Sequence, residues 1–313
     1  MSSYTLGIDT SNYATSLAVF DTAGEVVCAK KRFLPVKEGQ LGLRQSDALF
    51  HHTAALPEML KELSGEFDLT KISAVGVSEK PRPVEGSYMP CFLAGESQGR
   101  GIADTLGVPF FPCAHQQGHI AAAAWSAGRP DLLDRPHLAW HLSGGTTELL
   151  YVQPDGVSVW AQKLGGTSDI SAGQLIDRTG QLLGLPFPAG KALDGLYGQA
   201  DVCQNYTVKI NDLTFSLSGM ENKVRELVER GTPPANVARF VVDTVVKAVL
   251  RTTDKALEQY PGLPVLCSGG VASNSALRAA LRDAVFAPPQ YSTDNALGVA
   301  ILARRALTGG SRL

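Results

Sequence analysis

Two histidines four residues apart, His115 and His119, are the side chains in this sequence best suited to hold a metal ion. Side chains at positions i and i+4 lie on one face of a helix, so both imidazoles can reach the same ion. The alanine-rich run 121–125 continues the helical pattern, and the apolar run 106–111 predicts a short buried strand ending in a turn. The pair is therefore expected on a helix just after a strand, although two such histidines can also be packed side chains or solvent-facing ones.

Zinc peptidases also carry a pair of histidines four residues apart on a helix, but this sequence lacks a further residue that their mechanism needs. The His-Glu-x-x-His helix of those enzymes needs a glutamate after the first histidine as general base. Gln116 occupies that position, and a neutral amide cannot take a proton from a metal-bound water. A metal that orients or polarises a substrate is still compatible with the sequence.

The composition is that of an ordinary globular protein. The 313 residues carry a net charge of −2, so no global basic field indicates nucleic-acid binding. A basic strip at 30–32 with Arg44 could contact RNA or could be a solvated face. The five cysteines form no C-x-x-C pair, and no apolar stretch approaches the roughly 20 residues of a membrane span. We expect a cytoplasmic protein with reduced thiols and no membrane contact.

An internal repeat organises the chain. Residues 6–25 align without a gap onto 138–157, and both copies predict strand, small polar turn, strand, turn, strand. The first turn carries Thr10-Ser11 in one copy and Ser143-Gly144-Gly145 in the other, where backbone amides can approach a phosphate. A third small-residue turn at 267–274 follows a strand and is expected to open a helix, whose N-terminus favours an anion.

Each such turn alone can be a tight connection, but three turns in a duplicated arrangement indicate more. Duplicated β-β-β-α units are typical of the actin-like ATPase and sugar-kinase superfamily, in which two ribonuclease-H-like lobes enclose a central nucleotide cleft. The sequence therefore predicts an α/β fold of this kind. We expect a first lobe at 1–134, completed by a C-terminal helix at 294–313, and a second lobe at 135–293 with the nucleotide-binding turns.

Several short motifs follow one another in a fixed order: the histidine pair, the turn at 141–145, a helical segment at 173–180, Pro-Ala-Gly at 188–190, Phe-Ser-Leu-Ser-Gly at 215–219, and Gly-Gly-Val-x-x-Asn at 269–274. Together they resemble the family of tRNA threonylcarbamoyladenosine transferase subunits, once classed as glycoprotein endopeptidases. The resemblance covers nearly the whole chain.

The resemblance implies a metal site. Its ligands would be His115, His119 and Asp294, a set that leaves coordination positions open and suits iron or zinc. Asp294 also precedes an expected helix at 296–306, so it can act as an N-cap.

The resemblance also implies a site for threonylcarbamoyl-AMP or an ATP-like nucleotide, without assigning any catalytic residue. Asp177 would accept a ribose hydroxyl, with an ordinary surface aspartate as the alternative. The residues implied are His141, Leu142, Ser143, Gly144, Gly145, Asp177, Gly190 and Asn274.

The implied reaction moves the threonylcarbamoyl group from threonylcarbamoyl-AMP to N6 of the tRNA adenosine beside the anticodon. The implied partners are tRNA and helper subunits, a smaller paralogue of the first lobe and a P-loop ATPase. Of the remaining histidines, His51-His52 is expected at a helix start in a structural role, and His137 receives no role.

Three positions depart from the pattern of that family. Tyr13-Ala14 replaces an acidic pair, Lys80-Pro81 stands in place of a Gly-Pro-Gly loop, and Thr146 replaces a histidine. These departures leave two alternatives open. One is a divergent paralogue acting as a carbamoyl-type transferase on another acceptor, as in hydrogenase maturation, and the other is a non-catalytic scaffold subunit.

Overall fold

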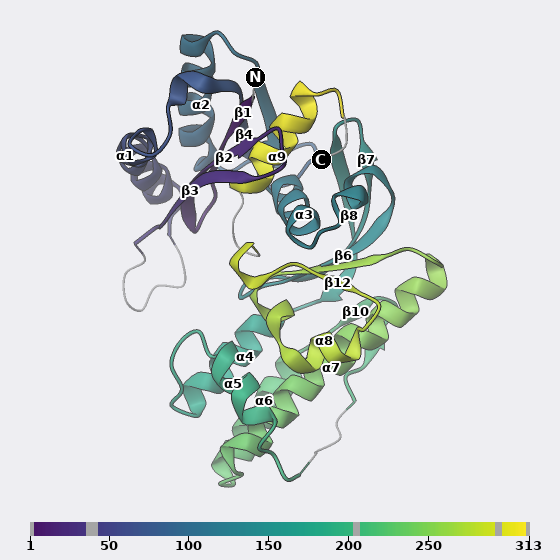
Figure 1. Ribbon diagram of the computed structural model, residues 1–313. Coiled ribbons are helices and arrows are strands. Elements are labelled where there is room, and N and C mark those ends of the chain that lie inside the picture. The colour runs from purple at the N-terminus through teal and green to yellow at the C-terminus, as the bar shows by residue number, and fades with distance from the viewer. Residues whose placement is uncertain (1–2, 36–42, 203–206, 292–295, 311–313) are drawn as a thin grey trace. The chain divides into compact units, whose positions relative to one another are not determined.

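The computed structural model describes residues 3–35, 43–202, 207–291 and 296–310 (Figure 1). The chain forms two compact units, and each has its own sheet and its own hydrophobic core. The first unit consists of residues 1–135, 153–161 and 293–313, and the second of 136–152 and 162–292. The stretch 153–161, which the sequence-based division places in the second lobe, therefore groups with the first unit.

The first unit is built on a five-stranded sheet in the order β3-β2-β1-β4-β5. Strands β1, β2 and β3 are antiparallel neighbours, while β4 and β5 continue the sheet in parallel. The five strands are β1 (Tyr4–Thr10), β2 (Ala14–Asp21), β3 (Val26–Phe33), β4 (Ile72–Lys80) and β5 (Phe110–Ala114).

Helices cover both faces of this sheet, which is why β1 is buried along almost its whole length. Helices α1 (Gln45–Ser64) and α2 (Phe92–Leu106) lie on one face, and α3 (His115–Ser126) and α9 (Ala296–Leu307) lie on the other (Figure 1). Short 3₁₀ turns, η1 (Leu69–Lys71) and η2 (Pro130–Asp134), connect these elements. Leu6, Ile8, Leu17, Leu56 and Val77 belong to the core between the sheet and α1 and α2.

The second unit repeats the same strand order in a seven-stranded sheet, β12-β11-β6-β7-β8-β10-β9. Strand β6 pairs antiparallel with β7 and parallel with β11, as β1 does with β2 and β4. The strands are β6 (His137–Leu142), β7 (Thr147–Asp155), β8 (Ser158–Thr167), β9 (Ile210–Asn211), β10 (Thr214–Phe215), β11 (Val265–Ser268) and β12 (Val285–Phe286).

The helices of the second unit are α4 (Ala172–Leu182), α5 (Gly190–Tyr197), α6 (Ser218–Glu229), α7 (Pro234–Gln259) and α8 (Ser275–Ala280), with 3₁₀ turns η3 (Gly270–Ser273) and η4 (Pro289–Tyr291). The 26-residue helix α7 carries a long buried stripe against the sheet. Trp140 of β6 is fully buried in this core, and its indole N–H donates to Thr253 Oγ1 of α7 at 2.8 Å.

The duplicated strand pattern is confirmed, because β1–β3 and β6–β8 occupy equivalent places in the two sheets. Two local expectations are wrong. Leu106 ends α2, and Gly107 takes the left-handed conformation that terminates a helix, so the next strand begins only at Phe110. The helix expected to start at His51-His52 already begins at Gln45 and continues through Pro57.

Candidate metal and nucleotide sites

The predicted helix after a strand is present, since α3 begins at His115 directly after β5. The rings of His115 and His119 are neighbours, with centroids 4.6 Å apart and planes at 77°. Both residues are partly buried. The two imidazoles therefore lie side by side, as their i,i+4 spacing predicts.

A buried carboxylate holds the first histidine. Asp9, near the end of β1, is fully buried, and its Oδ1 lies 2.8 Å from His115 Nδ1 and accepts from Ser78 Oγ at 2.5 Å. Desolvation raises the pKa of the Asp9 carboxyl, but the charge and hydrogen bond of His115 and the hydrogen bond of Ser78 outweigh it, so the pKa is lowered. Asp9 is therefore an anion in the interior of the first unit.

The N-terminal turn of α3 is fixed by further hydrogen bonds. Gln116 donates its backbone N–H to the carbonyl of Pro81 at 3.0 Å, so the loop after β4 is tied to the helix. Gln117 accepts from the Ala114 amide at 2.7 Å and donates from Nε2 to the Val159 carbonyl at 2.6 Å. These contacts restrict how far the histidine pair can move.

The remaining predicted ligand, Asp294, lies outside the described residues. Within the part of the chain that the structure describes, three or more His, Cys, Asp or Glu side chains nowhere group around a common metal position. The residues present nevertheless fit a metal, because two imidazoles are adjacent and one of them, His115, contacts the carboxylate of Asp9, whose Oδ2 is buried and has no hydrogen-bond partner among the described residues. A third ligand is still required to complete the site.

The two copies of the first turn differ in exposure. In the first unit Thr10 and Ser11 are buried; the Thr10 hydroxyl accepts from the Gly95 amide at 3.2 Å, and the Ser11 carbonyl contacts His52 Nε2 at 2.8 Å. In the second unit Gly144 and Gly145 are exposed. Of the two copies, only the second has glycines in this turn, and both glycines are exposed to solvent.

Hydrogen bonds shape this exposed turn of the second unit. The Ser143 amide donates to the Thr146 carbonyl at 2.8 Å, and the Thr146 amide donates back to Ser143 Oγ at 3.1 Å. Ser171, the N-cap of α4, donates its hydroxyl to the Gly144 carbonyl at 2.6 Å. Gly144 has open space where a Cβ would stand.

The third turn lies beside the first because β11 and β6 are parallel neighbours. His141 is paired in register with Ser268, and its Nδ1 lies 3.4 Å from Ser268 Oγ. Gly269 has a φ of +95°, and a Cβ there would lie 2.1 Å from the carbonyl oxygen of Leu142. Only glycine allows this approach of the two backbones.

Asp177 and Gly190 also meet. Asp177, on α4, is half-buried and accepts the amide of Ala189 at 2.9 Å, so it anchors the residue just before Gly190, the first residue of α5. Asp194, further along α5, accepts from Asn274 Nδ2 at 2.8 Å and from Ser275 Oγ at 2.8 Å. The predicted residues of the second unit are therefore linked from the turn at Gly144 through α4 and α5 to Asn274.

This arrangement modifies one expectation. The helix after the third turn does not start at the glycines, because η3 intervenes and α8 begins at Ser275. Asn274 Oδ1 accepts the Leu277 amide at 3.0 Å, and Asp194 accepts the Ser275 amide at 3.2 Å. The N-terminus of α8 thus already faces the carboxylate of Asp194, so these amides are not open to the phosphate expected at the third turn from the sequence.

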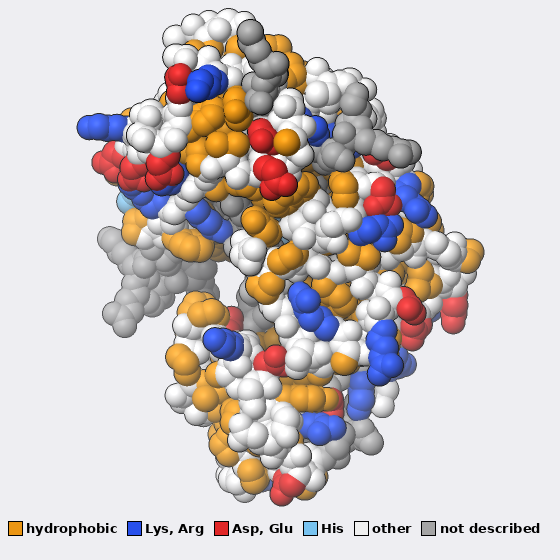
Figure 2. Space-filling view, viewed as in Figure 1, with side chains coloured by type: hydrophobic (Ala, Val, Ile, Leu, Met, Phe, Trp, Pro, Cys, Tyr) orange, Lys and Arg blue, Asp and Glu red, His pale blue; other side chains and the backbone are white. Residues whose placement is uncertain are grey.

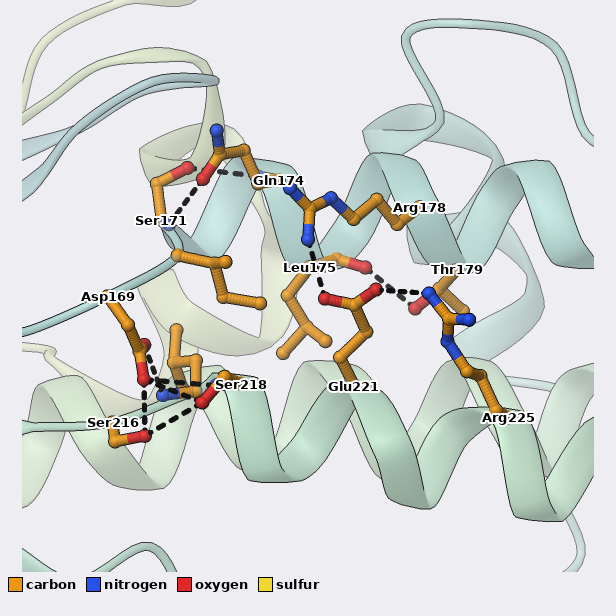
Figure 3. A network of polar contacts seen from close by, with 12 residues as sticks. Asp169, Ser171, Gln174, Leu175, Arg178, Thr179, Ser216, Ser218, Glu221 and Arg225 are labelled. Carbon is orange, nitrogen blue, oxygen red and sulfur yellow. Dashed lines mark hydrogen bonds and ion pairs between the residues drawn. The ribbon is translucent and has the colours of Figure 1, made fainter.

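The Phe-Ser-Leu-Ser-Gly segment is held by a second carboxylate (Figure 3). Asp169 accepts from Ser216 Oγ at 2.5 Å, from Ser218 Oγ at 2.8 Å and from the Leu217 amide at 2.9 Å, at the start of α6. Burial raises the pKa of Asp169, but these donors outweigh it and lower the pKa to about 2. The carboxylate therefore acts as a cap for α6.

An ion-pair cluster joins α4 to α6 (Figure 3), and its member Arg178 follows Asp177 in the chain. Glu221 accepts from Arg178 at 2.6 Å and from Arg225 at 2.8 Å. Hydrogen bonds from Arg225, outweighing partial burial, and from Arg178 lower the pKa of Glu221. The cluster links α4, which carries Asp177, to α6.

His52 and two residues of the basic strip make contacts within the first unit. His52 is buried, with Nδ1 2.7 Å from Thr15 Oγ1, which agrees with the structural role expected for it. Two residues of the basic strip form ion pairs within the first unit, since Lys30 pairs with Glu66, and Arg32 pairs with Glu58 and Glu62. Figure 2 shows acidic and basic side chains next to one another on the face drawn. Over the described residues, no helix combines the length and apolarity that crossing a membrane requires.

Comparison with known structures first defines the fold. The chain has the fold of the actin-like ATPase and sugar-kinase superfamily. It is similar to HypF from T. kodakarensis, with a TM-score of 0.61 at 13% identity over 98% of this chain and 48% of the other. It is also similar to a ROK family glucokinase from Streptomyces griseus, with a TM-score of 0.54 at 15% identity over 96% and 99% of the two chains. The predicted fold class is confirmed.

The sequence then defines the family. The sequence profile of TsaD, tRNA N6-adenosine threonylcarbamoyltransferase, matches residues 37–301, so the chain belongs to this family. Relatives of that name include proteins of Enterococcus faecalis, 30% identical over 90% of this chain and 80% of the relative, and of Thermus thermophilus, 31% identical over 96% and 92%. The family resemblance and the transferase class expected from the motifs are confirmed.

Sequence reasoning missed two carboxylates of these sites, Asp9 and Asp194. Asp9 had a signal, because it is the one charged residue in a largely buried strand, directly before Thr10-Ser11. Asp194 follows Gly190 by four residues, one helical turn into the next helix. Neither spacing alone tells which residue the carboxylate will meet.

Proposed function

We propose that this chain transfers the threonylcarbamoyl group from threonylcarbamoyl-AMP to N6 of the tRNA adenosine next to the anticodon. The family match over residues 37–301 is the observation that carries the proposal. The relatives of that name act, by their printed description, on a tRNA adenosine. Such a reaction requires tRNA, and we expect it in the cytoplasm with a smaller paralogue and a P-loop ATPase as helper subunits.

The residues divide the work. His115, His119 and Asp294 would hold one iron or zinc ion, which when bound would orient and polarise the threonylcarbamoyl group. The turn at His141, Leu142, Ser143, Gly144 and Gly145 would bind phosphate through its exposed backbone amides, with Asp177, Gly190 and Asn274 around the nucleoside.

In the reaction itself, the exocyclic amine of adenosine attacks the carbamoyl carbon and forms a C–N bond. The bond from that carbon to the phosphate oxygen breaks, AMP leaves with the electron pair, and the amine loses a proton. The contribution of the protein is positioning and charge stabilisation. No described residue is assigned as the base.

The direct test is complementation. The gene is expressed in a strain depleted of its own threonylcarbamoyltransferase, and tRNA nucleosides are quantified by mass spectrometry. We expect threonylcarbamoyladenosine to return with the wild-type chain and not with the His115→Ala/His119→Ala variant. The Thr15→Val variant, which alters the partner of the structural His52, is the matched control and restores the nucleoside.

Two outcomes would support the alternatives. If the wild-type chain leaves threonylcarbamoyladenosine absent but binds metal and ATP, the Tyr13-Ala14 and Lys80-Pro81 departures mark a transferase with another acceptor. If it binds neither, the chain is a scaffold subunit. Metal content is measured on the purified protein, where we expect about one iron or zinc per chain, lost in the double variant.

A further inference from the structure

Asp9 is an unusual residue for its position. It lies on β1, the central strand of the first unit, which is buried on both faces. A buried carboxylate is costly unless its oxygens are fully hydrogen-bonded. Here Oδ1 has two partners, Ser78 and His115, and Oδ2 has none among the described residues. The fold alone gives no reason for an anion at this point, so its contact with His115 requires an explanation.

The geometry of that contact selects one ring nitrogen. Asp9 Oδ1 lies 2.8 Å from Nδ1 of His115. Because Oδ1 is already the acceptor of the Ser78 hydroxyl, it also accepts at this contact, so Nδ1 carries the proton and donates it. In a neutral imidazole the lone pair is then on Nε2, the nitrogen at the far side of the ring. Metal-binding histidines commonly have this arrangement, in which a carboxylate on one nitrogen fixes the ring for the metal on the other.

Asp9 acts through His115 and is not a ligand itself. Asp9, His115 and His119 do not converge on a common metal position, since no group of three such side chains does so among the described residues. The carboxylate is fully buried behind a histidine side chain that is 21% exposed. The hydroxyl of Ser78 holds the same oxygen from β4, so the carboxylate cannot turn away from the ring without losing that bond.

We propose that Asp9 is the positioning residue of the metal site, setting the tautomer and orientation of His115 so that Nε2 is presented to the metal. This inference rests on the proposed function in taking His115 as a metal ligand. Loss of such a carboxylate costs about 10–100-fold in metal affinity.

The first measurement needs no variant and no metal. Long-range ¹H–¹⁵N NMR spectra of the metal-free protein at about pH 8.5, where an ordinary histidine is neutral, report which ring nitrogen is protonated. We expect His115 as the Nδ1–H tautomer. Asp9→Asn, which keeps the shape and removes the charge, shifts His115 toward the Nε2–H tautomer. An Nε2–H tautomer in the wild-type protein would overturn the inference.

The second measurement is cobalt(II) binding, followed through the visible absorption of the bound ion. We expect Asp9→Asn to weaken affinity about 10–100-fold and to change the absorption bands, and Ser78→Ala to have a smaller effect of the same kind. Thr15→Val is the matched control, because Thr15, on β2 of the same sheet, contacts Nδ1 of the buried His52 on α1 at 2.7 Å. That variant leaves the affinity, the spectrum and the His115 tautomer unchanged.

The outcomes separate the inference from the proposed function. Equal cobalt affinity and spectra in wild type and Asp9→Asn overturn the positioning role while the metal site stands. If the wild-type protein binds no metal, the proposed metal site fails, and with it the role of Asp9 toward a metal, whatever the tautomer. If Asp9→Asn does not fold, the wild-type tautomer and the Ser78→Ala titration decide the question.

Discussion

Substitutions at two glycines, Gly144 and Gly269, are expected to affect different properties, phosphate binding at the first and stability at the second. At Gly144 a Cβ meets no heavy atom within 4 Å, whereas at Gly269 it would lie 2.1 Å from the Leu142 carbonyl oxygen in a backbone with φ of +95°. Gly144→Val therefore adds bulk only on the solvent side of the turn. We expect this variant to keep its free energy of unfolding to within about 0.5 kcal/mol. Gly269→Ala combines backbone strain with overpacking and is expected to lose about 2–6 kcal/mol.

The loss in binding follows from the same geometry. A hydrogen bond from an amide to a charged group contributes about 1.5–3 kcal/mol, so blocking one amide from a phosphate weakens ATP binding by about 10- to 150-fold. Isothermal calorimetry with ATP and urea unfolding of the same samples measure both quantities. A folded Gly144→Val protein with wild-type ATP affinity refutes the phosphate-binding turn, and a Gly269→Ala protein of wild-type stability refutes the close approach of the two backbones.

Three further variants test the polar contacts of the second unit. Asp169→Ala removes the cap of α6 and lowers the free energy of unfolding by about 1 kcal/mol at neutral pH, after allowing for solvent screening. Because the pKa of Asp169 is lowered to about 2, this contribution is complete above the ordinary value of 3.8 and is lost as the pH falls through about 2. Urea unfolding of the wild type and of Asp169→Ala at pH 7, 4 and 2 measures this contribution. A difference in stability that is the same at all three pH values contradicts the role of Asp169 as an ionised cap. Asp177→Ala leaves the Ala189 amide without its acceptor and weakens ATP binding measured by calorimetry. Asp177→Asn keeps an acceptor, so its ATP affinity stays near that of the wild type. Equal losses of affinity in both variants would mean that the charge itself contacts the ligand. Glu221→Gln lowers the free energy of unfolding by less than about 1 kcal/mol, because Arg178 and Arg225 are both more than a third exposed. Urea unfolding in 1 M salt shows a smaller loss of stability, because salt screens the ion pairs. An equal loss at both salt concentrations would mean that the pairs are not screened.

Much of the fold could be predicted from patterns within short segments of the sequence. The repeat of 6–25 at 138–157 predicted equivalent strands because strand order and turn chemistry are written in short segments. The histidine pair was found on the expected helix because an i,i+4 spacing fixes the relative directions of two side chains on a helix. Motif order identified the family, and the profile match confirmed it.

Contacts between distant residues could not be predicted in this way. Asp9 and His115 are 106 positions apart, and only the pairing of β1, β4 and β5 brings them together. The exposure of the two glycine-rich or hydroxyl-rich turns also depends on packing, since α1 and α2 bury Thr10-Ser11 through His52 and Gly95. The metal ligand set and the nucleotide residues stay predictions until binding is measured.

The C-terminal helix has a consequence for how the protein is made. Helix α9 covers the first sheet so closely that a Cβ on Gly7 would lie 2.0 Å from the Ala296 carbonyl oxygen, and Thr5 Oγ1 donates to the Ala300 carbonyl at 2.9 Å. The ribosome synthesises β1 before α9, so the second unit is made before α9 can pack on this face of the sheet. Until α9 has been made, the apolar residues of the sheet that it covers stay exposed, so the first unit can complete its fold only after the second unit has been synthesised.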